Sequence, residues 1–169
     1  YDVITNFPKD MKVPIFVVQH MPPGFTKAFA ERLDKNSLLR VVEAIREEPI
    51  TPGVVYIAPG GYHMTVNPKN IVLDTSPSIH GVKPAVDKLF ISAAEVYKDK
   101  LLCCVFTGMG RDGAEGVRAI KAKGGFTMAQ DEVTSVIYGM PKAAYETGCV
   151  DVVLPDYEIL REIIRLTLK

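Results

Sequence analysis

The sequence has no excess of charge of either sign. Its 20 basic residues balance 20 acidic residues to a formal net charge of zero, and they form neither a basic block nor an acidic tail. Nucleic acids and anionic membranes are bound chiefly through clustered lysine and arginine side chains. We therefore expect no nucleic-acid partner.

Cysteine is also scarce, and long apolar runs are absent. Two of the three cysteines, Cys103 and Cys104, are adjacent within an apolar run, so their spacing fits neither a disulfide framework nor a metal-binding knuckle. Such usage is typical of the reducing cytoplasm. No apolar stretch approaches the roughly 20 residues that a membrane-spanning helix needs. We expect a cytoplasmic protein that does not insert into a membrane.

Length and composition favour one compact domain. A chain of 169 residues that is 47% apolar can bury one sizeable core but does not comfortably form two. The sequence opens at Tyr1 rather than at a methionine, and no complete strand is predicted before Val13. We therefore expect residues 1–169 to be a single domain that is truncated at its amino terminus.

Apolar runs of strand length alternate with segments of helical periodicity. Strands are predicted at residues 13–18, 38–45, 54–58, 62–66, 71–74, 101–106, 126–129 and 150–154. The first is rich in β-branched residues, as in strands that are buried on both faces. Helices are expected from Phe25, from Pro84, after the glycine turn near residue 113, from Pro141 and after a cap at Asp156. This order predicts a doubly wound α/β fold with a mostly parallel sheet, helices on both faces and an antiparallel excursion over residues 54–74.

Two polar side chains follow predicted strands, where open α/β sheets bind their ligands. His20 comes after the first strand, and Asp112 lies in the glycine-rich turn of LLCCVFTGMGRDGAEG, residues 101–116. A histidine can take up a proton near neutral pH, and a carboxylate can orient it, so the two would form two-thirds of a hydrolase triad. The alternative is structural: His20 packs in its turn, and Asp112 caps the helix that follows it.

The same turn also matches a nucleotide-binding pattern. Residues 108–113, GMGRDG, fit G-x-G-x-x-G between a strand and a helix, and Asp131 follows about 20 residues later, where a dinucleotide fold would hold a ribose. This arrangement would place a pyrophosphate at the start of the helix. However, Asp112 would repel that pyrophosphate from within the loop, an effect that Arg111 offsets only in part.

The remaining candidates are weaker. Cys103 and Cys104 lie in mid-strand, where buried apolar packing is a better explanation than a thiolate nucleophile. His63 and His80 have no metal-ligand spacing with His20, so we expect exposed loop histidines, no metal site and no cofactor. No serine stands in a G-x-S-x-G nucleophile elbow. The serines are Ser37, Ser76, Ser78, Ser92 and Ser135.

Five segments, spread over nearly the whole chain in order, are similar to one family. The sequence resembles the catalytic domain of the bacterial chemotaxis protein-glutamate methylesterases, the CheB type. The matching segments are VVQHMPPGFTKAFAERLD (17–34), YIAPGGYHM (56–64), KPAVDKLFISAA (83–94), FTGMGRDGAEG (106–116) and AQDEVTSVIYGMP (129–141).

This resemblance implies a serine hydrolase on a doubly wound sheet. In it, His20 is the general base, Asp112 is its orienting carboxylate, and Met109 lines the site beside the oxyanion position. The family removes methyl groups from glutamate γ-esters on the signalling helices of chemoreceptors, and some members deamidate glutamine there. A receiver domain of the response-regulator type normally precedes the catalytic domain.

In the family, the nucleophilic serine lies in a Gly-Ser-Thr-Gly-Gly-like loop upstream of the histidine. This loop follows the first strand of the family's domain, and neither that strand nor the loop is in this sequence. We therefore expect that the nucleophile lies outside this chain, that none of its five serines replaces it, and that the chain alone is inactive.

Overall fold

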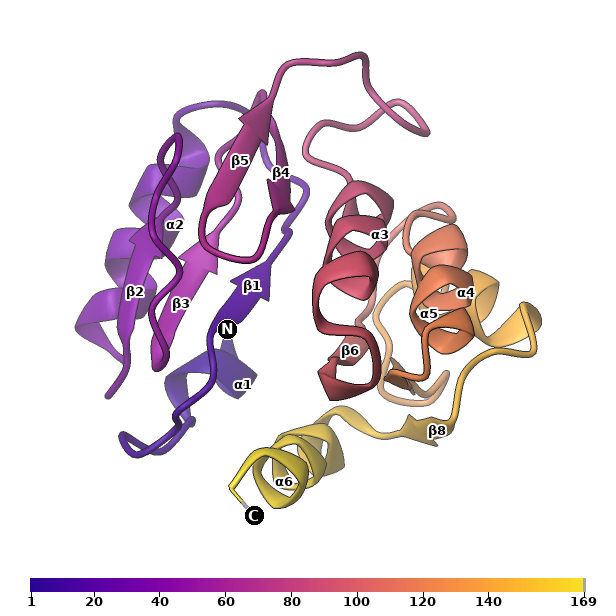
Figure 1. The fold of residues 1–169 in the computed structure, drawn as a ribbon. Coiled ribbons are helices and arrows are strands. Elements are labelled where there is room, and N and C mark those ends of the chain that lie inside the picture. The colour runs from indigo at the N-terminus through magenta and orange to yellow at the C-terminus, as the bar shows by residue number, and fades with distance from the viewer. Residues whose placement is uncertain (169) are drawn as a thin grey trace.

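A computed structural model describes residues 1–168 (Figure 1), in which strands and helices alternate along the chain as expected. The elements are α1 (Asp2–Thr5), β1 (Ile15–Val17), α2 (Phe25–Lys35), β2 (Arg40–Glu43), β3 (Val54–Ile57), β4 (His63–Val66), β5 (Ile71–Asp74), α3 (Val86–Tyr97), the 3-10 helix η1 (Lys98–Lys100), β6 (Leu102–Val105), α4 (Ala114–Ala122), β7 (Phe126–Gln130), α5 (Met140–Glu146), β8 (Val152–Leu154) and α6 (Asp156–Thr167).

The parallel strands form two groups of three. One has the order β1-β3-β2 and the other has the order β6-β7-β8. The strands β4 and β5 form an antiparallel hairpin, with His63 opposite Asp74. The predicted α/β class, with mostly parallel strands and an antiparallel hairpin, is thus confirmed. One detail was wrong: β3 runs parallel between β1 and β2, so only β4 and β5 belong to the antiparallel excursion.

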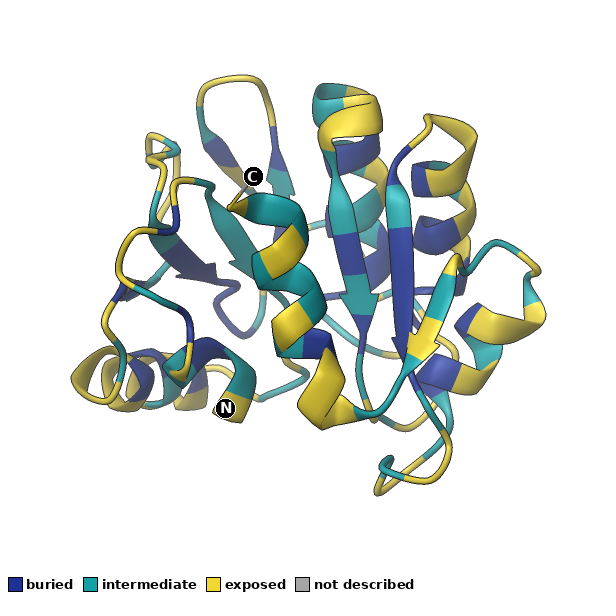
Figure 2. Ribbon diagram, turned by 90° about the horizontal axis from the view of Figure 1, so that it is seen from below, coloured by how far each residue is buried: buried dark blue, intermediate teal, exposed yellow. Residues whose placement is uncertain are grey.

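Helices and the hairpin cover both faces of the first group of strands. On one face, α1, α2 and part of α6 close a core around Leu33 and Val55. On the other face, the hairpin and α3 close a second core around Tyr56 and Met64. A third core joins α3, α4 and α5 to β6. Buried residues therefore lie on the strands and on the helix sides that face them (Figure 2).

The strand β1 is less buried than its sequence predicts. Ile15 and Val17 pack towards the first core and Phe16 towards the second, as in a strand that is covered on both faces. All three residues are nevertheless only half-buried. The reason is that, in the part of the chain that the structure describes, β1 pairs with β3 alone. Likewise β6 pairs with β7 alone, so each of these strands has one open edge.

Two helix starts also differ from expectation. The helix α3 begins at Val86 rather than at Pro84, and Asp156 lies within the first turn of α6 behind an N-cap at Pro155. The longest α-helices have 12 residues, and none of the described helices is long and apolar enough to cross a membrane.

The close packing of α4 on α3 requires a glycine. A Cβ atom placed on Gly116 would lie 2.4 Å from Cβ of Phe90. We therefore expect Gly116→Ala to lower the free energy of unfolding by about 1–3 kcal/mol through overpacking, although alanine is the better helix former by about 1 kcal/mol. Urea unfolding followed by circular dichroism measures the change. The control is Glu115→Ala at the exposed neighbouring position, and a stabilised Gly116→Ala variant would contradict the prediction.

Candidate active site

The structure brings His20 and Asp112 together from two strand ends. His20 follows β1 and Asp112 follows β6, and the two residues are 92 positions apart in the sequence. Nε2 of His20 lies 2.7 Å from Oδ2 of Asp112, which is a short hydrogen bond. This contact also places the loops after β1 and β6 next to each other.

Asp112 is held by the first turn of α3 rather than by its own helix. Its Oδ2 accepts the N–H of Val86 at 2.6 Å, and its Oδ1 accepts the N–H of Asp87 at 2.9 Å. Its side chain is only 2% exposed. Burial alone would raise the pKa of Asp112, but the hydrogen bonds from His20, Asp87 and Val86 outweigh it and hold this pKa below its ordinary value. Asp112 is therefore a carboxylate at neutral pH.

The hydrogen bond to Asp112 decides which nitrogen of His20 is free. An ionised carboxylate only accepts, so Nε2 must carry the proton in the neutral ring. Nδ1 is then left with its lone pair, and the side chain is 25% exposed. The pair can thus act as a general base, with Asp112 fixing the tautomer and stabilising the imidazolium that forms.

A buried threonine anchors the loop that carries His20. Thr26 donates to Oε2 of Glu43 at 2.5 Å and accepts the N–H of Gly60 at 2.9 Å. A Cβ atom on Gly60 would lie 2.7 Å from the backbone of Pro22, so the two loops touch through their main chains. Sequence reasoning missed this support; the only signal was the pair of Pro- and Gly-rich turns at residues 22–24 and 59–61.

Met109 lies at the tip of the glycine turn after β6. Its side chain is 76% exposed, and its neighbour Gly110 has a φ of 95°. The turn is tied to the loop before α5, because the N–H of Gly108 donates to the carbonyl of Ile137 at 3.0 Å and the Gly108 carbonyl accepts from Met140 at 2.8 Å. Met109 is therefore exposed on a turn whose backbone is hydrogen-bonded to the loop before α5.

The dinucleotide alternative is not favoured by this arrangement. A pyrophosphate would need free N–H groups at the start of α4. Those of Gly113 and Gly116 donate to Oδ1 of Asp87 at 3.0 and 2.8 Å instead. Oδ1 of Asp131 accepts the N–H and the hydroxyl of Thr134, so the carboxylate that would hold a ribose is engaged in its own turn.

Of the other two histidines, His80 is an exposed loop residue as expected, whereas His63 is not. The expectation that His63 is exposed was wrong: it is fully buried on β4, where Nε2 donates to the Pro77 carbonyl at 3.0 Å and Nδ1 accepts the N–H of Ala85 at 3.2 Å. His80 contacts Oδ2 of Asp87 at 3.1 Å. Neither hydrogen-bonds to His20, and the pairing of His63 with the loop before α3 carries no signal in the local sequence.

A metal site finds little support among residues 1–168. The side chains of His80, Asp87 and Asp112 bring three ligand atoms within 4.8 Å of one another. Each carboxylate oxygen of the two aspartates already accepts at least one N–H group, however, so the hydrogen bonds within the protein satisfy them.

The cysteines offer no nucleophile in Cys103. Burial raises the pKa of the Cys103 thiol to about 12, which keeps it protonated and unreactive.

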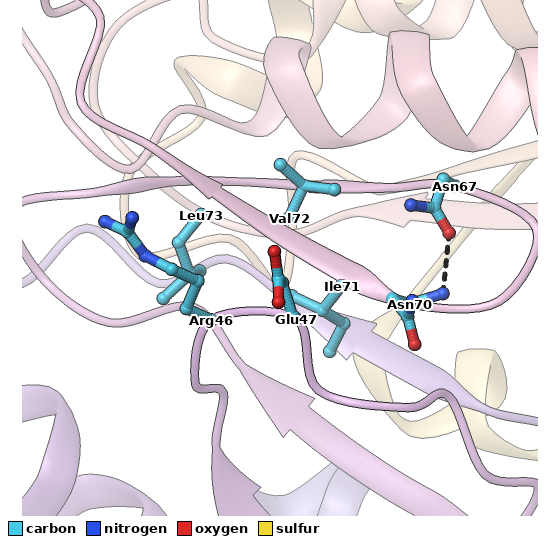
Figure 3. A pocket seen from close by; sticks show the side chains of 7 residues that line it. All are labelled: Arg46, Glu47, Asn67, Asn70, Ile71, Val72 and Leu73. Atoms are coloured by element: carbon cyan, nitrogen blue, oxygen red, sulfur yellow. Dashed lines mark hydrogen bonds between the residues drawn. The ribbon is translucent and has the colours of Figure 1, made fainter.

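A hollow beside the hairpin lies apart from these residues (Figure 3). It is bounded by the loop after β2 and by β5, and none of the residues discussed above lines it. Its Asn67 accepts the N–H of Asn70 at 2.7 Å, which closes the hairpin turn. The lining residues are Arg46, Glu47, Asn67, Asn70, Ile71, Val72 and Leu73.

Comparisons with known proteins agree with one another. A family model described as CheB methylesterase matches residues 1–163. The chain is 58% identical over 167 residues to the protein-glutamate methylesterase/protein-glutamine glutaminase of Clostridium acetobutylicum, covering 98% of this chain and 48% of that protein. Its identity to the protein of the same name from Pyrococcus horikoshii is 50%, over 96% of this chain and 45% of that one.

A solved structure is similar as well. The crystal structure of the Thermotoga maritima CheB methylesterase catalytic domain matches with a TM-score of 0.93 and 48% identity, over 96% of this chain and 88% of that one. The chain spans about half the length of the curated relatives it matches.

Proposed function

Because the chain belongs to the CheB methylesterase family, we propose that it forms most of the catalytic domain of an enzyme that hydrolyses glutamate γ-methyl esters on chemoreceptors. The observation that carries this proposal is the hydrogen bond of 2.7 Å between His20 and the buried Asp112. The relatives are also named as protein-glutamine glutaminases. Deamidation of glutamine, an acyl transfer to water with ammonia as leaving group, is therefore part of the proposal.

His20 acts as the general base in this mechanism, through Nδ1. It takes the proton of a serine hydroxyl as the serine oxygen attacks the ester carbonyl, and Asp112 stabilises the imidazolium that results. His20 then returns the proton to the departing methoxide, which leaves as methanol. A water molecule repeats both steps on the acyl-enzyme and releases glutamate.

The serine itself comes from a segment outside these 169 residues. Within the described part of the chain no serine hydroxyl contacts His20; those of Ser92 and Ser135 donate to the carbonyls of Leu89 and Asp131. Among the described residues, β1 and β6 each have one open edge, which offers backbone groups to a further parallel strand. A serine on the loop after such a strand would lie on the Nδ1 side of His20, away from the hydrogen bond to Asp112.

The glycine turn supplies the oxyanion site. Among residues 1–168, the N–H groups of Met109 and Gly110 donate to no protein acceptor, which leaves them available to a developing oxyanion. In enzymes where one such donor has been removed, its contribution to the stabilisation of the transition state is about 3 kcal/mol. Met109, exposed at the tip of this turn, borders the space that the ester occupies.

The partners follow from the proposed reaction. The substrate is a methylated helix of a chemoreceptor, and the protein works in the cytoplasm. The relatives are about twice as long as this chain, which leaves room for a receiver domain of the response-regulator type.

The test uses the full-length protein, meaning this chain together with the segment that carries the serine. Incubated with receptor signalling domains that carry glutamate methyl esters, it is expected to release methanol in proportion to enzyme concentration. The 169-residue chain alone is the matched control and should release none. Absence of methanol release by the full-length protein, or binding of a nicotinamide dinucleotide at millimolar concentration, would contradict the proposal.

A further inference from the structure

A second buried carboxylate, Asp87, lies beside the proposed triad and has no part in the mechanism above. It is 3% exposed, in the first turn of α3. Its carboxylate and that of Asp112 have oxygens within 4.8 Å of each other. Two ionised carboxylates at this separation repel each other, and burial strengthens the repulsion. Such a pair needs hydrogen-bond donors on every side to persist.

Each of the two aspartates caps the helix of the other. Asp112 precedes α4 but accepts N–H groups from the first turn of α3, whereas Asp87 belongs to α3 but accepts the N–H groups of Gly113 and Gly116 at the start of α4. Neither helix has a side-chain cap at its own N-cap residue. The positive ends of both helices thus face the carboxylate pair and offset its repulsion.

His80 holds the remaining oxygen of Asp87. Its Nε2 lies 3.1 Å from Oδ2 of Asp87. His80 and Gly81 form the centre of a tight turn, in which Ile79 and Val82 exchange two backbone hydrogen bonds of 2.9 Å. Both central residues have positive φ, 53° and 77°. This tight turn sets the backbone from which the His80 side chain reaches Asp87.

We infer that Asp87, oriented by His80, is a positioning residue for the proposed esterase. By tying the first turn of α4 to α3, Asp87 fixes the direction in which Asp112 presents its Oδ2 to His20. Neither Asp87 nor His80 touches the ester. The inference rests on the proposed function only for its catalytic readout, because the geometry of the His20–Asp112 hydrogen bond is measurable without a substrate.

The first test is Asp87→Asn in the full-length protein. Asparagine keeps the shape but places an NH₂ group where an oxygen now accepts an N–H, so Asp112 shifts relative to His20. We expect kcat for methyl-ester hydrolysis to fall by about 10- to 100-fold with KM nearly unchanged, since misplacement by about 1 Å has effects of this size. The proton resonance of His20 Nε2–H, shifted downfield by its carboxylate acceptor, should move or disappear.

His80 provides a second series that does not disturb a buried charge. His80→Ala removes the donor to Asp87 and should lower kcat and shift the same resonance, whereas His80→Gln keeps an N–H donor and should restore most of both. The matched control is Asp151→Asn. Asp151 also accepts a backbone N–H, from Thr127 at 2.9 Å, but at the amino end of β7, so this variant should leave kcat and the resonance unchanged.

The outcomes separate the inference from the proposed function. A wild-type kcat and an unmoved His20 resonance in Asp87→Asn would overturn the positioning role, as would equal losses in His80→Ala and His80→Gln. If Asp87→Asn does not fold, the comparison of His80→Ala with His80→Gln tests the positioning role by the same two readouts, kcat and the His20 resonance. If the full-length protein has no esterase activity, a resonance that moves in Asp87→Asn but not in Asp151→Asn supports the positioning role independently of the substrate.

Discussion

Replacing His20 with alanine in the full-length protein is expected to lower kcat for methyl-ester hydrolysis by about 10⁶-fold, the effect of removing the histidine of a serine protease triad. Without the imidazole, no group takes the serine proton and none returns it to the methoxide. KM should change little, because His20 contacts the reacting atoms and not the remote parts of the receptor helix. Initial rates of methanol release over a range of substrate concentrations measure both constants.

The control for His20→Ala is Gln19→Ala at the exposed neighbouring position. It changes the same loop after β1 without touching the hydrogen bond to Asp112 and should keep the wild-type rate. Circular dichroism of both variants verifies that they fold. Turnover of His20→Ala within about tenfold of the wild type would remove His20 from the role of general base.

Replacing Asp112 with asparagine is expected to lower kcat by about 10⁴-fold, as the equivalent change does in serine proteases. An asparagine that turns its NH₂ group towards His20 forces the proton onto the wrong ring nitrogen. One that turns its oxygen there leaves NH₂ against the N–H of Asp87. The matched control is Asp131→Asn, an acid in the turn after β7 whose carboxylate accepts hydrogen bonds from Thr134. Near-normal turnover of Asp112→Asn would exclude Asp112 from the triad.

The stabilising effect of the Asp112 carboxylate on the fold is also expected to depend on pH. The pKa of Asp112 lies below its ordinary value in the folded protein. Its carboxylate therefore stabilises the fold above the unfolded-state pKa of about 3.9, and this contribution is lost as the pH falls through the folded-state pKa. We expect the wild type to exceed Asp112→Asn in free energy of unfolding at neutral pH, with a difference that shrinks below about pH 4. Urea unfolding at a series of pH values measures it, and a constant difference would contradict the assignment.

The proximity of His20 and Asp112 was predictable because it depends on a general property of parallel sheets. Each residue follows an apolar run of strand length, and the carboxyl ends of parallel strands meet at one edge. No local pattern, in contrast, could reveal that Asp112 caps α3 and that Asp87 caps α4. Those contacts cross 25 to 29 positions and depend on how closely Gly116 lets the two helices approach.

The strands were likewise easier to predict than their partners. Alternating apolar runs locate β1, β2 and β3, but their periodicity does not distinguish a central parallel strand from a member of a hairpin, so β3 was misplaced. The burial of His63 was missed for a similar reason. Its partners are the Pro77 carbonyl and the N–H of Ala85 in the loop before α3, and only the tertiary structure brings that loop over β4.

The position of α6 has a consequence for how the protein folds during synthesis. Leu160 and Ile163 of this helix pack against the core that Ile4, Met11 and Leu33 form at the other end of the sequence. A ribosome therefore makes β1, β2 and β3 well before α6, which completes their cover. Until α6 emerges, this core stays exposed on one side, where a chaperone has its clearest target.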